Sequence, residues 1–486
     1  MWSSKTTPAS YGLPPLTTDR THAEATPERR RSRRPRVVHL NGNSESTPPS
    51  LSPWWVGITV VLALLILALP LMMGQRTPAT LTATAVFMTT CVLIAAAMAM
   101  VLMMGNASDP VSRPSRAWLV WAGLLTGWVV LQVLPWPALA QWLGPYPEAL
   151  WQQGDWTPRT WSPDPSATLR SWSVFVALFG LAWLASQLPR RLRLTLWLAV
   201  VASALFQGVY GLLAHAGGAT EIFGIWQRNN VGAVHGSFSN RNLYAGYLAL
   251  CWPLVASIWF VRGVPVIHRW PIEVRAALSL ISAGIVGAAM LGSSSRLGTA
   301  GGVFAMGVMV LLWGYQRKLA GRSPWPGVAA VVTAMVAATW YGLTPLATRL
   351  LATGEEVRGE VIAVVLQEAP TSWWLFGVGL GSFEAVFKQL QPGHISGWWD
   401  YLHNDLLQFA LEMGVVGLVL LAMVAVALWR RWRLSTERAA LTAGLAGLCV
   451  IALGDFSWHI PATQVVIALM LGTLLASSRR SASSPS

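Results

Sequence analysis

The sequence predicts an all-α, polytopic membrane protein of about twelve transmembrane helices with one large outer loop. Of its 486 residues, 54% are apolar and only 11% are charged, whereas about a quarter of the residues in soluble domains carry a charge. Apolar runs long enough to cross a bilayer recur along the chain, and Trp residues flank many of them, as in interfacial aromatic belts. We therefore expect most of the chain to lie in lipid.

The basic residues and the cysteines exclude several classes of function. The formal net charge is +14, but the Lys and Arg residues stand in short clusters between apolar runs, as topology signals do. We therefore expect a lipid bilayer and no nucleic acid as a partner. Cys91, Cys251 and Cys449 lie inside apolar runs without metal-ligand spacing. The sequence thus suggests no disulfide framework, no metal site and no cofactor.

Residues 1–50 are predicted to be a disordered, cytoplasmic tail. They are rich in Ser, Thr, Pro and Arg and lack apolar periodicity, so they cannot bury enough surface to fold. The basic run at 29–36 precedes an apolar run that is too long for a signal-peptide core and has no small-residue cleavage site after it. We expect the tail to stay attached.

Twelve apolar runs have roughly the 20 residues that a membrane-spanning helix needs. They fall at about 54–74, 80–104, 117–136, 169–188, 194–215, 242–261, 276–293, 298–315, 326–344, 405–429, 437–454 and 461–478.

A cytoplasmic N-terminus places the basic clusters between these spans on the inner side, loop after loop. The same topology puts three long segments outside, at 137–168, 216–241 and 345–404, and long loops are usually functional. We divide the chain accordingly. The parts are the tail 1–50, the N-terminal spans in 51–215, a second membrane region over 216–478 that includes the loop 345–404, and a cytoplasmic tail at 479–486.

The first candidate binding segment is Gly236–Gly246, at the start of the sixth span. A helix N-terminus offers free N–H groups and the positive end of a dipole, so Arg241 and Asn242 beside it would suit an anion. The alternative is that Asn240 or Asn242 caps the helix and Arg241 reaches the interface. The sequence leaves both interpretations open.

The second candidate is Ser293-Ser294-Ser295-Arg296, in a tight outside turn between the seventh and eighth spans. Arg296 breaks the positive-inside trend, and its guanidinium is suited to bidentate contact with phosphate. Binding of a lipid headgroup or capping of a carbonyl would also explain it.

The third candidate is the outer loop, which contains Arg358, a Gly-x-Gly-x-Gly run at 377–381, His403 and Asn404. No strand–helix unit surrounds the glycines, so we expect them to permit a sharp turn or close packing and not to bind a nucleotide. A neutral His403 beside a cavity can take a proton from an attacking hydroxyl. The alternative is a His that is hydrogen-bonded at a helix start, with Asn404 as the cap.

The fourth candidate is the segment 454–462 between the last two spans. If it is helical, Asp455 and His459 lie one turn apart and would orient each other or a substrate hydroxyl. A polar cap before Pro461 is the alternative.

Taken in order, these segments resemble the O-antigen ligase and polysaccharide polymerase superfamily, over roughly residues 200–470. The most recognisable pieces are GSFSNRNLYAGYL at 236–248, SSSR at 293–296, GVGLGSFEAVF at 377–387, HNDLLQFALEMGVVGL at 403–418 and DFSWHIPA at 455–462.

The resemblance implies a metal-independent glycosyltransferase of the bacterial inner membrane, with its active face in the periplasm. The donor would be a glycan on a polyprenyl (undecaprenyl) pyrophosphate, and the acceptor lipid A-core, a growing polysaccharide or a protein. By resemblance, Arg296 and Arg358 would hold the pyrophosphate, and His403 would act on the acceptor hydroxyl. We add Arg241, Asn242, Asn404, Asp455 and His459 as expected substrate contacts. Cations that stabilise the departing charge and a base for the nucleophile suffice for this reaction.

Two other functions fit a polytopic membrane protein. A transporter or flippase for polysaccharide precursors would carry ionisable residues near the bilayer midplane, whereas Glu412 is the main such residue here. A non-catalytic scaffold would tolerate changes at His403 and the arginines. For the transferase we expect the outer loop to fold into short amphipathic helices that roof a cavity open to lipid.

Overall fold

A computed structural model describes residues 52–74, 78–104, 114–145, 158–228, 232–261, 267, 269–319, 321, 323 and 356–476. The chain divides into two units, Met1–Ser50 and Leu51–Ser486. All the described residues belong to the second unit, and the account below concerns that unit.

The described part is almost entirely helical, which confirms the predicted all-α membrane class. Eight of its helices are long and apolar enough to cross a membrane. A helix coincides with eleven of the twelve predicted spans, and the span expected at 326–344 lies outside the described residues. These helices are α1 (Pro53–Leu71), α2 (Pro78–Met104), α3 (Arg116–Val133), α6 (Pro165–Gln187), α7 (Arg190–Ala216), α8 (Arg241–Ser257), α10 (Ile272–Gly292), α11 (Arg296–Leu319), α16 (Asp405–Arg430), α17 (Thr436–Ile451) and α18 (Pro461–Leu475).

Helix α8 forms the centre of the unit. Every residue from Leu243 to Ser257 is buried, as expected of a helix that is apolar on all sides. It packs against α7, α10, α11 and α17. Close helix contacts rely on small residues, since a Cβ added at Gly444 of α17 would lie 2.3 Å from the carbonyl oxygen of Leu250.

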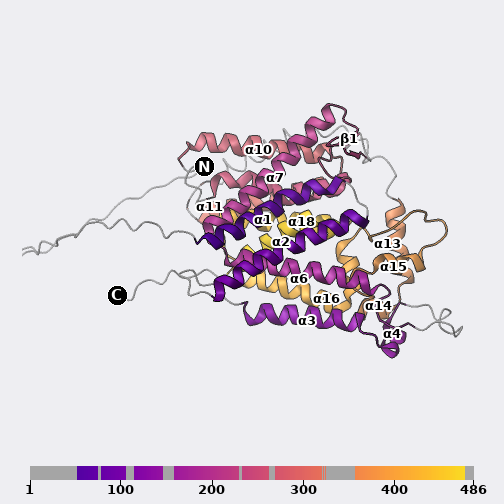
Figure 1. Cartoon of the computed structure of the whole chain (residues 1–486). Helices are drawn as coiled ribbons and strands as arrows, with labels where there is room; N and C mark the ends of the chain where they lie inside the picture. The colour runs from indigo at the N-terminus through magenta and orange to yellow at the C-terminus, as the bar shows by residue number, and fades with distance from the viewer. Residues whose placement is uncertain are drawn as a thin grey trace, which may run out of the picture. The chain divides into compact units, whose positions relative to one another are not determined.

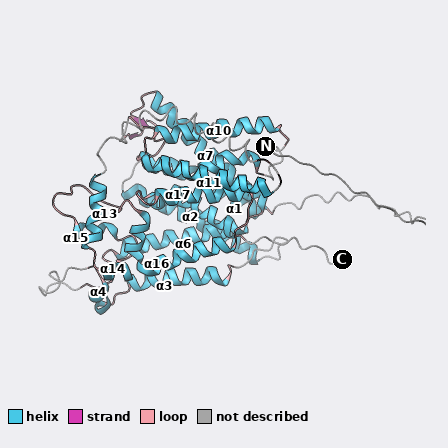
Figure 2. Ribbon diagram, turned by 180° about the vertical axis from the view of Figure 1, so that it is seen from behind, coloured by secondary structure: helices cyan, strands magenta, loops and turns pink. Residues whose placement is uncertain are grey.

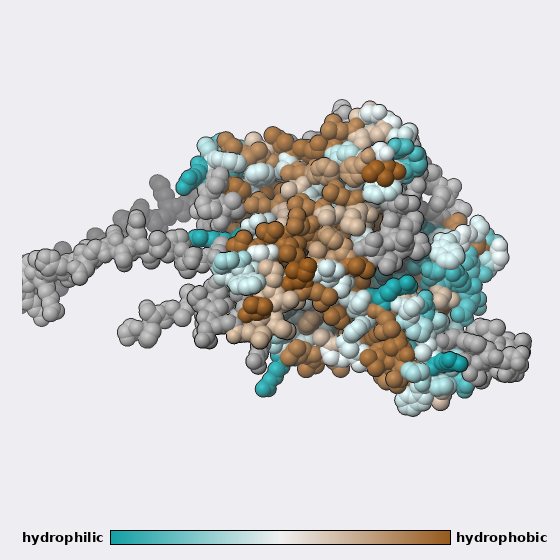
Figure 3. All heavy atoms as spheres, viewed as in Figure 1, coloured by the Kyte–Doolittle hydropathy of each residue, from teal (hydrophilic) through white to brown (hydrophobic). Residues whose placement is uncertain are grey.

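The short elements gather at one end of the long helices. Figures 1 and 2 show α4 (Pro137–Leu143), α13 (Glu356–Glu368), α14 (Thr371–Phe376) and α15 (Phe383–Leu390) there. The hairpin of β1 (Glu221–Ile222) and β2 (Trp226–Gln227), which pair antiparallel, lies at the same end. On the face shown in Figure 3, apolar side chains cover the middle and hydrophilic ones gather toward this end. The described parts of the three segments predicted to share one side of the membrane therefore lie at the same end of the long helices.

The outer loop has a small core of its own. Val361 and Val365 of α13, Trp373 of α14 and Phe383 and Phe387 of α15 are buried in one cluster. That cluster also includes Leu402 and Leu411, which lie before and within α16. The expectation that this loop folds into short helices is confirmed, and the core ties these helices to the start of α16.

Helix α16 is broken at Gly414, whose backbone has φ 63° and ψ −158°. A break inside a membrane helix frees carbonyl groups, which must find other donors. The indole N–H of Trp128 donates to the Met413 carbonyl at 3.1 Å, and that of Trp121 donates to the Leu420 carbonyl at 3.0 Å. Residues of α3 thus satisfy the backbone of α16 near the break.

Candidate functional site

The glycine run of the outer loop is docked onto the break in α16. The N–H of Val378 donates to the Leu411 carbonyl at 3.0 Å, and the N–H of Gly379 donates to the Glu412 carbonyl at 3.1 Å. Gly377 has φ 83°, and a Cβ there would lie 2.4 Å from the Glu412 carbonyl oxygen. The glycines therefore serve close packing, as the sequence predicted, because only glycine combines this φ with this approach.

Side chains from α3 and from the preceding segment fix the same loop. Gln132, fully buried in α3, donates to the Glu412 carbonyl at 3.1 Å and accepts from the Leu380 N–H at 3.0 Å. The Ser162 hydroxyl lies 2.8 Å from that of Ser382. Segments more than 200 residues apart in sequence therefore meet at this loop.

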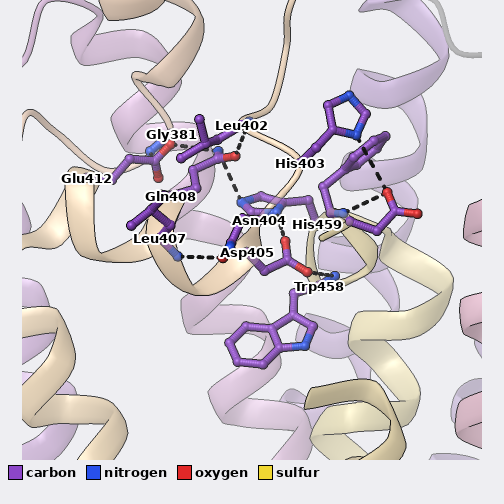
Figure 4. Close-up of polar contacts among 12 residues, drawn as sticks. Gly381, Leu402, His403, Asn404, Asp405, Leu407, Gln408, Glu412, Trp458 and His459 are labelled. Carbon is purple, nitrogen blue, oxygen red and sulfur yellow. Dashed lines mark hydrogen bonds and ion pairs between the residues drawn. The ribbon is translucent and has the colours of Figure 1, made fainter. Parts of the chain in front are cut away.

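Glu412 and Gln408 continue the network toward the expected catalytic residues (Figure 4). The Glu412 carboxylate accepts from the Gly381 N–H at 2.7 Å and from the Gln408 amide at 2.9 Å. The amide oxygen of Gln408 accepts from the Leu402 N–H at 2.9 Å. These bonds fix the backbone immediately before His403.

His403 occupies a strained position between aromatic rings. Its backbone φ is 58°, a conformation that costs energy for a residue with a Cβ. Its ring contacts Trp399 and Phe456 edge to face, with centroid distances of 5.6 and 4.7 Å. Its Nδ1 lies 3.7 Å from an Asp455 carboxylate oxygen, and its side chain is 16% exposed. A strained residue held in this way by its surroundings is typical of a functional position.

His459 is paired with Asp405, and not with Asp455 as the sequence suggested. The Nδ1 of His459 lies 2.7 Å from Asp405 Oδ1, and the Trp458 N–H donates to Asp405 Oδ2 at 2.8 Å. The predicted pairing is wrong because the segment is not an α-helix. A single 3-10 turn at Ser457–His459 turns His459 toward α16, and Asp455 faces His403 instead.

Asn404 is the N-cap of α16, as one interpretation of the sequence had it. Its side-chain oxygen accepts from the Leu407 N–H at 2.9 Å, and its amide donates to the Leu453 carbonyl at 2.9 Å. Both polar atoms therefore bind the protein itself, which positions the neighbouring His403 and Asp405.

The segment before α8 packs on the turn after α10. The Val234 N–H donates to the Gly292 carbonyl at 3.0 Å, next to the turn Ser293–Ser295. Asn240 caps α8, with its side-chain oxygen 2.8 Å from the Asn242 nitrogen. Arg241 is then the first residue of α8, and Asn242 the second.

Arg296 begins α11 after the tight turn that the sequence predicted. Helices α8 and α11 are in close contact at their starts, since a Cβ on Gly298 would lie 2.3 Å from the Ala245 Cβ. A Cβ on Gly454 would lie 2.6 Å from Leu297. The start of α11 is therefore next to the start of α8 and to the segment that carries Asp455, so the first, second and fourth sequence candidates come together.

Arg358 lies apart from these residues in its contacts. It is in the first turns of α13 and partly exposed. Among the described residues, no hydrogen bond or ion pair joins it to Arg241, Arg296 or His403. Residues 324–355, which connect α11 to α13, lie outside the described part.

Sequence reasoning missed Arg228, which follows β2. It is only 6% exposed, and one N–H donates to the Ala219 carbonyl at 3.1 Å. Its Nε and Nη2 make no hydrogen bond to the described residues. A buried guanidinium with unused donors suits an anion. The sequence feature that could have identified Arg228 is its place in a segment predicted to lie on the outer side, where the positive-inside trend disfavours arginine.

His235, in the same segment, is fully buried. Its Nδ1 lies 2.6 Å from the Phe238 carbonyl oxygen, so this nitrogen donates. Burial, together with the nearby Arg228 charge, lowers the pKa of His235 to about 4. This imidazole is therefore neutral at physiological pH.

A family model described as O-antigen ligase matches residues 277–422, less than a third of the chain. The matched stretch begins in α10, contains Arg296, Arg358 and His403, and ends in α16. Arg241, Asp455 and His459 lie outside it. No curated protein matches the chain. Among the described residues, no group of three or more His, Cys, Asp or Glu residues is arranged to hold a metal ion.

Proposed function

We propose that this chain, whose residues 277–422 match the family model described as O-antigen ligase, transfers a glycan from a polyprenyl pyrophosphate to an acceptor hydroxyl. The acceptor is lipid A-core, a growing polysaccharide or a protein. The reaction takes place on the periplasmic face of a bacterial inner membrane, and the N-terminus of the chain is cytoplasmic.

The observation that carries the proposal is the convergence of cations and paired imidazoles at one end of the helices. Arg296 begins α11 beside α8, whose first residue is Arg241, and both lie near the segment that holds Asp455. Asp455 faces His403 at 3.7 Å. This arrangement supports a site in which a pyrophosphate and a hydroxyl are bound side by side.

The roles follow from charge. Arg296 holds the pyrophosphate and stabilises the charge that develops as it departs. Arg358 is assigned to the same group by the resemblance, and not by its contacts in α13. Arg241, Asn242 and the buried Arg228 extend the same anion site. These cations replace the divalent metal that other phosphate chemistry uses, so the transfer proceeds without one.

His403 takes the proton of the acceptor hydroxyl as that oxygen attacks the anomeric carbon and the bond to the pyrophosphate breaks. Asp455 stabilises the imidazolium that forms, because an opposite charge within about 4–6 Å favours the charged form. Asn404 holds the backbone of this pair by capping α16.

The test is transfer by purified full-length protein in nanodiscs, with a polyprenyl-pyrophosphate glycan, candidate acceptors and EDTA. We expect wild-type transfer to persist in EDTA and to fall by at least about 100-fold in His403→Ala, Arg296→Ala and Arg358→Ala. His394→Ala and Arg159→Ala are matched controls, because both residues are exposed. Active His403 and arginine variants would refute the site. Movement of precursor across the bilayer without glycosylation would indicate the transporter alternative.

A further inference from the structure

The tip of the β1–β2 hairpin, Phe223–Ile225, folds back along the side of α7. The ring of Phe223 stacks on Tyr210 at 4.6 Å and lies 6.5 Å from the ring of Phe206, between centroids. The Phe223 N–H donates to the Tyr210 hydroxyl at 2.8 Å. Since α7 ends at Ala216, rings at positions 206 and 210 place the tip roughly 9–15 Å before that end, at 1.5 Å per residue. The hairpin therefore runs beside the helix and does not project from it.

The face of α7 that carries these rings is apolar and exposed. Ala202, Phe206, Val209 and Leu213 are exposed, and their spacing is that of one helix face. The helix packs against α1, α8 and α10 with its other, buried positions. In a membrane-spanning helix, an apolar face that no neighbouring helix covers contacts lipid. Phe223 thus stacks on the lipid-facing side of α7.

The length of α7 indicates how deep this contact lies. Its 27 residues span about 40 Å, more than the roughly 30 Å of a hydrocarbon core. The first turn holds three arginines, and one of them, Arg193, lies 3.5 Å from Glu437, so this end marks one interface. A count of about 20 residues from Leu194 places the opposite hydrocarbon boundary near Leu213. Tyr210 lies inside that boundary, and the hairpin tip lies level with it.

The residues of the tip suit lipid better than water. The Ile225 N–H donates to the Ile222 carbonyl at 3.0 Å, and the two residues between them have φ of 55° at Phe223 and 68° at Gly224. A turn with two positive φ values favours Asn, Asp or Gly, so a phenylalanine here is strained. Ile225 is 67% exposed. The N–H groups of Phe223 and Ile225 are both bonded within the protein, as surroundings of low polarity require.

We propose that the hairpin tip inserts into the bilayer beside α7, with Phe223 and Ile225 in contact with lipid acyl chains near the hydrocarbon boundary. Lipid is the occupant because the tip continues the lipid-facing side of a membrane-spanning helix. The base of the hairpin is polar, since the Gln227 amide donates to Glu221 at 2.7 Å, and it lies at the level of the headgroups. The proposal does not depend on the transferase function. It makes part of the segment 216–241 a membrane anchor.

The first test measures how fast a water-soluble maleimide labels single cysteines in the full-length protein, in nanodiscs of phosphatidylethanolamine and phosphatidylglycerol. Cys449 is exposed and is first replaced by alanine, whereas Cys91 and Cys251 are buried. We expect Ile225→Cys to react at least about 10-fold more slowly than Gln227→Cys, because the thiolate is the reactive form and a thiol in hydrocarbon does not ionise.

Ile225 and Gln227 are both exposed in the protein itself, so slow labelling at position 225 reports cover by lipid. Val209→Cys, on the exposed face of α7, is the matched lipid-facing reference and should react as slowly as Ile225→Cys. Equal rates for Ile225→Cys and Gln227→Cys would overturn the proposal.

The second test attaches a nitroxide to the same cysteines. Dissolved oxygen concentrates in hydrocarbon, whereas a polar nickel chelate stays in water, and each speeds the relaxation of a nitroxide that it reaches. We expect oxygen to act more strongly than nickel at Ile225→Cys, as at Val209→Cys, and the reverse at Gln227→Cys. Thermal unfolding of each variant verifies the fold. Equal access of nickel to positions 225 and 227 would contradict contact with lipid.

A second copy of the chain is the other possible cover for the tip. Nanodiscs that hold one or two copies distinguish the two. Slow labelling of Ile225→Cys in single-copy discs supports lipid as the occupant. Slow labelling only in discs with two copies would assign the tip to an interface between copies and overturn the proposal.

Discussion

Glu412 accepts a hydrogen bond from the backbone N–H of Gly381 at 2.7 Å, so a carboxylate inside a membrane helix fixes a glycine of the outer loop. An ionisable residue within a span usually marks a transport or proton path. Here its two oxygens bind Gly381 and Gln408. Its position is therefore explained by a structural anchor, which weakens the transporter alternative.

Two substitutions at Glu412 distinguish a structural role of its hydrogen bonds from a role of its negative charge. We expect Glu412→Leu to lower the free energy of unfolding by about 1–3 kcal/mol, because the partly buried Gly381 N–H loses its acceptor. Glu412→Gln keeps an acceptor oxygen and should retain most of the stability. Thermal unfolding in detergent measures both, with the exposed Glu384→Gln as a control. Equal stability of Glu412→Leu and wild type would contradict the anchor.

The break in α16 requires glycine at position 414. A Cβ there would lie 2.4 Å from the Leu375 carbonyl oxygen, at φ 63°. We expect Gly414→Ala to cost more than about 1 kcal/mol and to lower the melting temperature by several degrees. Gly284→Ala in α10 is the matched control, because its Cβ meets nothing within 4 Å. Similar melting temperatures for the two variants would show that the break in α16 does not require glycine at position 414.

The strain at His403 predicts an unusual order of stability. His403→Gly should be more stable than His403→Ala by about 1 kcal/mol, because both lose the ring but only alanine pays for the positive φ. Both should lose transfer. At His459, whose φ is not positive, the order should reverse. Chemical or thermal unfolding of the four variants checks this, and the same order at both positions would refute the strain.

The buried His235 predicts a pH dependence of stability. Its pKa is about 4 in the folded protein and near 6.5 when unfolded. The unfolded chain therefore binds more protons between these values, and the folded state loses stability as the pH falls from about 6.5 to 4.

His235→Asn keeps a donor for the Phe238 carbonyl but cannot titrate. We expect the melting temperature of this variant to fall less than that of wild type over the same pH range. His394→Asn, at an exposed position, serves as the control. A slope identical to that of wild type would contradict the buried neutral imidazole.

The helices were predictable because apolar length dictates a membrane span. The turn at Ser293–Ser295, the cap at Asn240 and the role of the glycines also followed from local residue chemistry. The pairing of His459 with Asp405 did not, because it joins residues 54 positions apart through a 3-10 turn that periodicity does not reveal. Sequence reasoning assigned no role to Asp405. The bonds of Gln132 to Leu380 and Glu412 were also hidden, because they join residues 248 and 280 positions apart.

The docking of the glycine run, residues 377–381, onto α16 limits how a substrate can reach the site. Its N–H groups at Val378, Gly379 and Gly381 are bonded to α16, and Gln132 holds Leu380. Lifting this loop would expose several unpaired polar groups in surroundings of low polarity, at a cost of several hydrogen bonds. It is therefore fixed in place and not a movable lid, and the lipid-linked donor proposed above would enter and leave by another route.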